Sequence, residues 1–102
     1  PFIDTAAALD EANGELSIFA INRNWESDNL AVFDVSGFEG WSFIEHIQMY
    51  SEDLTARNTY ENPNAVIPTV NRDAKFENGK ATVTLKSLSW NVLRFRKPGT
   101  DA

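Results

Sequence analysis

Short runs of apolar and β-branched residues, each closed by turn-forming residues, follow one another along the 102-residue sequence. Runs of this length and spacing are typical of the strands of an all-β domain. The clearest pair covers residues 74–77 and 80–85, joined by Asn78-Gly79, a dipeptide that favours a type I′ hairpin turn. A second Asn-Gly pair, Asn13-Gly14, follows an extended segment at residues 2–9 and predicts another turn.

Further strands are predicted where such a run is long enough to cross a sheet. They cover residues 16–22, 30–35, 41–50 and 88–96, with a short extended piece around residues 66–70. The run LSIFAIN at 16–22 is apolar at almost every position, which predicts burial on both of its faces. Together the segments predict an antiparallel, jelly-roll-like β-sandwich of about seven or eight strands. We expect residues 1–97 to form this single domain and residues 98–102 to form a polar tail.

The charges are distributed unevenly along the chain, which carries a net charge of −6 from 15 acidic and 9 basic residues. Residues 1–71 contain 12 acidic and 2 basic residues, whereas residues 72–102 contain 3 acidic and 7 basic residues. We expect this asymmetry to pair acidic strands with basic strands across a sheet. The acidic balance argues against nucleic acid as a partner, because it repels phosphate. No apolar run approaches the roughly 20 residues of a membrane-spanning helix, so no membrane partner is expected.

The chain contains no cysteine and one histidine, His46. Disulfides and thiolate metal sites are therefore excluded, and no zinc site is expected. A cysteine-free composition fits the cytosol, although a cysteine-free secreted bacterial domain would look the same. We expect no cofactor, because the sequence has no phosphate-cradling glycine loop and no calcium-binding loop. His46 is interpreted as a hydrogen-bonded structural histidine on a strand.

Four landmarks, in order along the chain, resemble the C-terminal β-sandwich of the α-L-arabinofuranosidases of glycoside hydrolase family 51. They are LSIFAINRN at residues 16–24, HIQMYSEDLTARNT at 46–59, NTYENPNAVIP at 58–68 and LKSLSWNVLRF at 85–95. The third is the most specific, because it combines fixed asparagine, glutamate and proline positions. The fourth departs from the family pattern, since Lys86-Ser87 stands where the family often has Pro-Pro.

The resemblance implies that the chain is part of a longer enzyme whose active site lies elsewhere. Enzymes of the family remove terminal arabinofuranosyl units from arabinan and arabinoxylan with retention, which needs two carboxylates roughly 5 Å apart. In the family both are glutamates on a (β/α)8 barrel that precedes this domain. No catalytic residue is therefore expected in this chain, and the barrel of the same polypeptide is the expected partner. Assembly into a homo-oligomer is left open.

The resemblance also implies a structural role for the long aperiodic segment at residues 54–70. Its family-signature residues are Asn58, Thr59, Glu61, Pro63, Val66 and Pro68. The prolines fix φ, and the polar side chains can satisfy local backbone groups, so we expect a braced loop that packs against the barrel. In the family a segment before the barrel also contributes to the sandwich. We therefore expect this chain to lack a strand and to expose a sheet edge and an apolar patch, through which it would self-associate when alone.

Two alternatives place a function inside the chain itself. An independent carbohydrate-binding module would use exposed aromatic side chains, on which sugar rings stack. Trp41 and Trp90 lie among apolar neighbours and are assigned to the core, which leaves Trp25, in the polar segment 23–29, as the surface candidate. Trp25 could equally pack against the barrel.

The second alternative is a pair of catalytic carboxylates within the chain. The candidates are Glu11, Glu15, Glu26, Glu39, Glu45, Glu52, Glu61 and Glu77. Their spacing does not favour a facing pair, so we interpret them as solvated surface acids.

Overall fold

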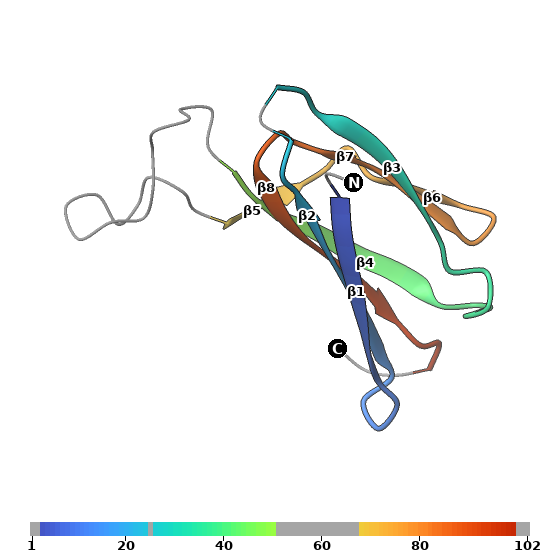
Figure 1. Ribbon diagram of the computed structural model, residues 1–102. Helices are drawn as coiled ribbons and strands as arrows, with labels where there is room; N and C mark the ends of the chain where they lie inside the picture. The colour runs from blue at the N-terminus through green and yellow to red at the C-terminus, as the bar shows by residue number, and fades with distance from the viewer. Residues whose placement is uncertain (1–2, 25, 51–67, 100–102) are drawn as a thin grey trace.

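A computed structural model describes residues 3–24, 26–50 and 68–99 of the chain. Eight strands form two antiparallel sheets that pack face to face (Figure 1). They are β1 (Ile3–Asp10), β2 (Glu15–Asn22), β3 (Asn29–Asp34), β4 (Ser42–Met49), β5 (Pro68–Asn71), β6 (Lys75–Glu77), β7 (Lys80–Leu85) and β8 (Ser89–Arg96). The larger sheet has the order β1-β2-β8-β4-β5, and the smaller has the order β3-β7-β6. The predicted antiparallel sandwich of seven or eight strands is confirmed.

The core lies between the two sheets, and alternation along the strands selects its members. Every second residue of β7 and β8 is buried, as expected when one face of a strand meets another sheet. The buried apolar residues are Leu16, Ile18, Ala20, Val35, Ala81, Val83, Leu85, Leu93 and Phe95. Phe95 is also the centre of an aromatic cluster, with ring centroids 5.4 Å from Phe43 and 5.7 Å from Phe76. This cluster joins β8 and β4 of the larger sheet to β6 of the smaller one.

Two expectations about burial are wrong. Strand β2 is buried on one face only, and Phe19, on the other face, is 44% exposed. Trp90 is 50% exposed instead of lying in the core. The reason is the same in both cases, since the smaller sheet covers one side of the larger sheet and these two side chains point to the opposite side. Trp41 does pack against the core, edge to face with Phe38 at a centroid distance of 5.2 Å.

The Asn78-Gly79 hairpin turn has the predicted type I′ geometry. Its two central residues have φ values of 53° and 74°, the positive values that this turn requires. The carbonyl oxygen of Gly79 accepts a hydrogen bond of 2.7 Å from the amide of Val35, which ties the hairpin to the end of β3. A Cβ atom at position 79 would lie 2.8 Å from the Cα atom of Ser36. Glycine is therefore required here by both conformation and space.

The turn between β1 and β2 is longer than a two-residue hairpin. It covers residues 11–14, and of its Asn-Gly pair only Gly14, at 65°, has a positive φ. Both the amide and the side chain of Asn13 donate hydrogen bonds to the Asp10 carboxylate, at 3.1 and 2.8 Å. These bonds stabilise the ionised carboxylate and lower the pKa of Asp10.

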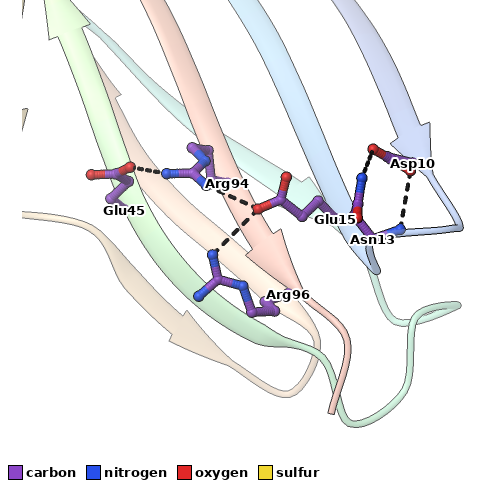
Figure 2. A network of polar contacts seen from close by, with 6 residues as sticks. All are labelled: Asp10, Asn13, Glu15, Glu45, Arg94 and Arg96. Atoms are coloured by element: carbon purple, nitrogen blue, oxygen red, sulfur yellow. Dashed lines mark hydrogen bonds and ion pairs between the residues drawn. The ribbon is translucent and has the colours of Figure 1, made fainter. Parts of the chain in front are cut away.

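The uneven charge distribution does pair acidic strands with a basic one. Arg94 of β8 binds Glu15 of β2 at 3.1 Å and also binds Glu45 of β4, and Arg96 binds Glu15 at 3.3 Å (Figure 2). Hydrogen bonds to both glutamates stabilise the guanidinium and raise the pKa of Arg94, with Glu45 as the larger contributor. The prediction of acidic strands beside basic ones is confirmed. We call these four residues the ionic cluster.

Substituting Gly79 by alanine should destabilise the chain by about 2–4 kcal/mol, because it combines a strained positive φ with a backbone clash. Urea unfolding followed by circular dichroism would measure this loss. Gly37→Ala is the matched control, since a Cβ atom there meets no atom within 4 Å and the residue does not have a positive φ. The control should change the unfolding free energy by less than about 0.5 kcal/mol. Equal effects of the two substitutions would contradict the close approach at Ser36.

Substituting Arg94 by methionine should cost about 1 kcal/mol at low salt, and the loss should shrink as the salt concentration rises. Arg94 links two carboxylates on two strands, whereas Arg23 makes a single exposed pair with Asp4 at 3.0 Å. Arg23→Met is therefore the control and should have a smaller effect in the same urea unfolding assay. A loss for Arg94→Met that does not respond to salt would show that packing of its aliphatic stem is responsible.

Candidate docking surface

The outer face of the five-stranded sheet, which points away from the core, carries two rows of apolar side chains. Strand pairing places Ala6, Phe19, Val92, Ile47 and Val70 side by side, one from each of the five strands. A parallel row consists of Ile21, Trp90 and Met49 on β2, β8 and β4. We call these eight residues the apolar ladder.

Three large apolar side chains of the ladder are well exposed. Phe19, Trp90 and Val70 are 44%, 50% and 51% exposed, and they lie on three different strands of one continuous face. Single exposed apolar residues are common, but contiguous apolar patches mark sites of association. The outer face of the smaller sheet has only two large apolar residues of this kind in the described part of the chain, Leu30 and Val32. The ladder is therefore the better candidate for an interface.

The ionic cluster forms the border of the ladder. Along β8 the outward residues are Trp90 and Val92, followed by Arg94 and Arg96, so the face changes from apolar to charged at the middle of the strand. Figure 2 shows Glu15, Glu45 and the two arginines on this charged half. An apolar centre flanked by paired charges is the arrangement that protein interfaces use.

The sandwich is also open along one side. Phe76 on β6 packs over Phe43 and Phe95, so β6 lies above β4 and β8, and β3 lies toward β2 and β1. Beyond β3 no further strand of the described residues covers the inward side of β1, where Leu9 is 46% exposed. The outer edge of β3 thus leaves backbone hydrogen-bonding groups available next to uncovered apolar surface.

Behind the ladder, the interior contains a network of buried polar side chains. Nε2 of His46 and Nε2 of Gln48 each lie 2.8 Å from Oδ1 of Asn91. The Asn91 amide donates to the Ala20 carbonyl oxygen at 3.1 Å, and the Asn71 amide donates to Gln48 Oε1 at 3.1 Å. The network therefore links β2, β8, β4 and β5 across the larger sheet.

His46 is the hydrogen-bonded structural histidine that the sequence predicted. Its side chain is fully buried, and burial disfavours the imidazolium ion, which lowers the pKa of His46 below 6.5. The hydrogen bond to Asn91 acts in the opposite direction but is the weaker influence. The imidazole is therefore neutral near pH 7.

Most of the residues predicted for the signature loop lie outside the described residues. These are Asn58, Thr59, Glu61, Pro63 and Val66, and the aromatic candidate Trp25 also lies outside. Pro68 is the first residue of β5 and pairs with Met49 of the ladder. The exposure of Phe19 and Trp90 was not predicted. Trp90 shares its face of β8 with Arg94 and Arg96, and this shared face is the signal that could have identified it as outward-facing.

The structure offers no arrangement of a catalytic pair or a metal site among the residues it describes. Glu15 and Glu45 are the two candidate carboxylates that come together, but both are bound to Arg94. No group of three His, Cys, Asp or Glu side chains within the described ranges could hold a metal ion. No helix in this part of the chain is long and apolar enough to cross a membrane.

Comparisons with known proteins agree on one family. Over 93% of its length the chain is 37% identical to the intracellular exo-α-(1→5)-L-arabinofuranosidase of Acetivibrio thermocellus, of which it covers 19%. It is 32% identical, over 95% of its length, to the intracellular exo-α-(1→5)-L-arabinofuranosidase 1 of Bacillus subtilis, again covering 19%. The chain thus spans about a fifth of the length of these relatives.

Solved structures show the same similarity. A family 51 α-L-arabinofuranosidase from Bifidobacterium longum matches 94% of the chain with a TM-score of 0.80 and 28% identity, over 19% of its own length. An α-L-arabinofuranosidase from Thermotoga maritima matches 92% of the chain with a TM-score of 0.75 and 30% identity, also over 19% of its length. Residues 5–89 match the family described as the α-L-arabinofuranosidase C-terminal domain. The chain belongs to this family, the C-terminal β-sandwich of glycoside hydrolase family 51 arabinofuranosidases that its landmarks predicted.

Proposed function

We propose that the chain is the non-catalytic accessory domain of a longer, retaining α-L-arabinofuranosidase. The longer protein would release terminal arabinofuranosyl units from arabinan or arabinoxylan. Support comes from the match of the chain to about a fifth of the length of proteins that are named exo-acting arabinofuranosidases. Those relatives are named intracellular, which supports a cytoplasmic location for this protein as well.

The chemistry would belong to the remainder of the polypeptide. Retaining hydrolysis requires one carboxyl group as acid/base and a second as nucleophile, both facing the scissile bond. Glu15 and Glu45 are instead bound by Arg94 on the outer face of the larger sheet. A catalytic (β/α)8 barrel in the same polypeptide would supply the two carboxylates.

The observation that carries the accessory role is the exposed apolar ladder. We infer that the ladder is the surface on which the catalytic barrel docks, with the ionic cluster at its rim. Interfaces between domains of one chain typically bury about 600–1,500 Å². Covering Phe19 and Trp90, which are 44% and 50% exposed, would contribute on the order of 1–3 kcal/mol each. Docking would therefore stabilise both domains.

The open side of the sandwich supports a second contact with the same polypeptide. A strand from another part of the longer protein, added to the free edge of β3, would cover Leu9 and complete the smaller sheet. In the chain alone, this edge and the ladder would instead favour pairing with a second copy. The loop at residues 58–68 would act as a brace, since it leads into β5 directly beside Met49 of the ladder.

The docking surface can be tested with a matched pair of substitutions in the full-length protein. Val70 lies in the ladder and Val32 lies on the opposite outer face, and the two are 51% and 58% exposed. Val70→Lys should lower the stability of the intact protein by about 2–4 kcal/mol, because it buries a charge in the interface. Differential scanning calorimetry and the half-life of activity on heating would measure this loss.

Val32→Lys should leave the intact protein within about 0.5 kcal/mol of the unsubstituted protein. In the 102-residue chain alone, both lysines should be tolerated, since both side chains are then exposed. Equal destabilisation of the full-length protein by the two substitutions would contradict the assignment of the docking face.

Exposure of Trp90 also favours a second candidate function, a carbohydrate-binding surface. Sugar rings stack on exposed aromatic faces, and Trp90 and Phe19 lie on neighbouring strands of one sheet face. Titrating the chain with arabino-oligosaccharides separates the two candidates. The docking proposal predicts unchanged tryptophan fluorescence, whereas saturable quenching that Trp90→Ala abolishes would support sugar binding and contradict docking as the role of the ladder.

A further inference from the structure

The buried imidazole of His46 has one satisfied and one unsatisfied nitrogen. Nε2 lies 2.8 Å from Asn91 Oδ1, an atom that can only accept, so the proton of the neutral ring is on Nε2. Nδ1 is buried and has no hydrogen-bond partner in the described structure. Protonation would add a second N–H at this position, where the described residues offer no acceptor, and would bury a positive charge.

No charged group faces the ring to compensate such a charge in the part of the structure that is described. The residues that pair with or bind His46 are uncharged: Leu93 and Asn91 on β8 and Asn71 on β5. The other buried residues of the two sheets are also uncharged, and they include Gln48 on β4, Ala20 and Asn22 on β2, and Val83 and Leu85 on β7. The nearest charged side chains by sequence and register are Glu45 and Arg94, which bind each other on the outer face. Arg72 and Asp73, which follow Asn71, are exposed.

The strand pair next to His46 has the shortest register in the larger sheet, with four paired residues. Strand β5 has four residues and is an edge strand of this sheet, held by β4. His46 pairs with Asn71, and the next pair, Ile47 with Val70, belongs to the apolar ladder. The side-chain hydrogen bond from Asn71 to Gln48 belongs to the same polar network as His46. Detaching β5 would therefore break the fewest strand pairings next to His46.

We propose that His46 is an acid-sensitive latch, whose protonation releases β5 from β4 and removes the Val70 end of the apolar ladder from the docking surface. The direction of the pH effect follows from how many protons the open and closed forms bind. An unfolded or open chain binds a proton at His46 near pH 6.5, whereas the closed chain does so only at lower pH. Lowering the pH through this window favours the open form, and raising the pH above it restores the closed form. The consequence for docking rests on the proposed function, but the latch itself does not.

The latch can be measured directly, because His46 is the one histidine of the sequence. NMR titration of its ring carbons should show that the imidazole remains neutral as the pH falls past about 6.5, the usual titration midpoint of a histidine. Amide hydrogen exchange, corrected for intrinsic rates, should show the protection of β5 falling roughly tenfold or more as His46 becomes protonated. Protection of the β1–β2 pair should change much less over the same range. Titration of His46 at an ordinary midpoint, with the amide protection of β5 unchanged, would overturn the proposal.

His46→Gln provides the matched variant, since its amide can still donate to Asn91 but does not titrate. In this variant the protection of β5 should be the same at about pH 7.5 and pH 5.5. Equal acid opening of β5 in the variant would overturn the proposal, and if the variant does not fold, the titration of the unsubstituted chain still decides. Acid opening of β5 that is equal in the chain alone and in the full-length protein would support the latch and contradict the docking face, because a docked ladder would hold Val70 and β5 closed.

Discussion

The strict alternation of side chains along β8 is the constraint on which the rest of the structure depends. Strand β8 lies at the centre of the larger sheet, between β2 and β4, so its inward residues set the core and its outward residues set the exposed face. Leu93 and Phe95 point inward and build the apolar core, while Ser89 and Asn91 point inward and begin the polar network. Trp90 and Arg94, on the other side, anchor the apolar ladder and the ionic cluster.

The unequal size of the two sheets leaves the outer side of this alternation uncovered by described residues. The three-stranded sheet covers one side of the five-stranded sheet, so the opposite side of the larger sheet is left without a layer of described residues. In a complete sandwich each sheet buries one face and presents a polar one to water. Here half of the outer face of the larger sheet is apolar, as the proposed docking against the remainder of a longer protein requires.

Sequence reasoning predicted the features that depend on local chemistry. The Asn78-Gly79 turn, the β-strand at Ser89–Arg96 and the pairing of acidic with basic strands follow from residue types and short spacing. The family landmarks identified the domain because they occur in order along nearly the whole chain. The exposure of Phe19 was not predicted, because an apolar strand gives the same sequence signal whether its second face meets another sheet or stays uncovered. Trp90 was misassigned because its neighbours Ser89 and Asn91 are polar and yet buried. The partners of His46 were equally inaccessible, since Asn91 is 45 residues away and is brought beside it only by the sheet order.

The central claim is that the apolar ladder is an interface, and side-chain footprinting tests it most directly. Carbene or hydroxyl-radical labelling would compare the 102-residue chain, at a concentration low enough to prevent self-association, with the full-length protein. The account predicts that Phe19, Trp90 and Met49 are labelled in the chain and protected in the full-length protein, while Leu30 and Val32 are labelled in both. Equal labelling of Phe19 and Trp90 in the two proteins would contradict it.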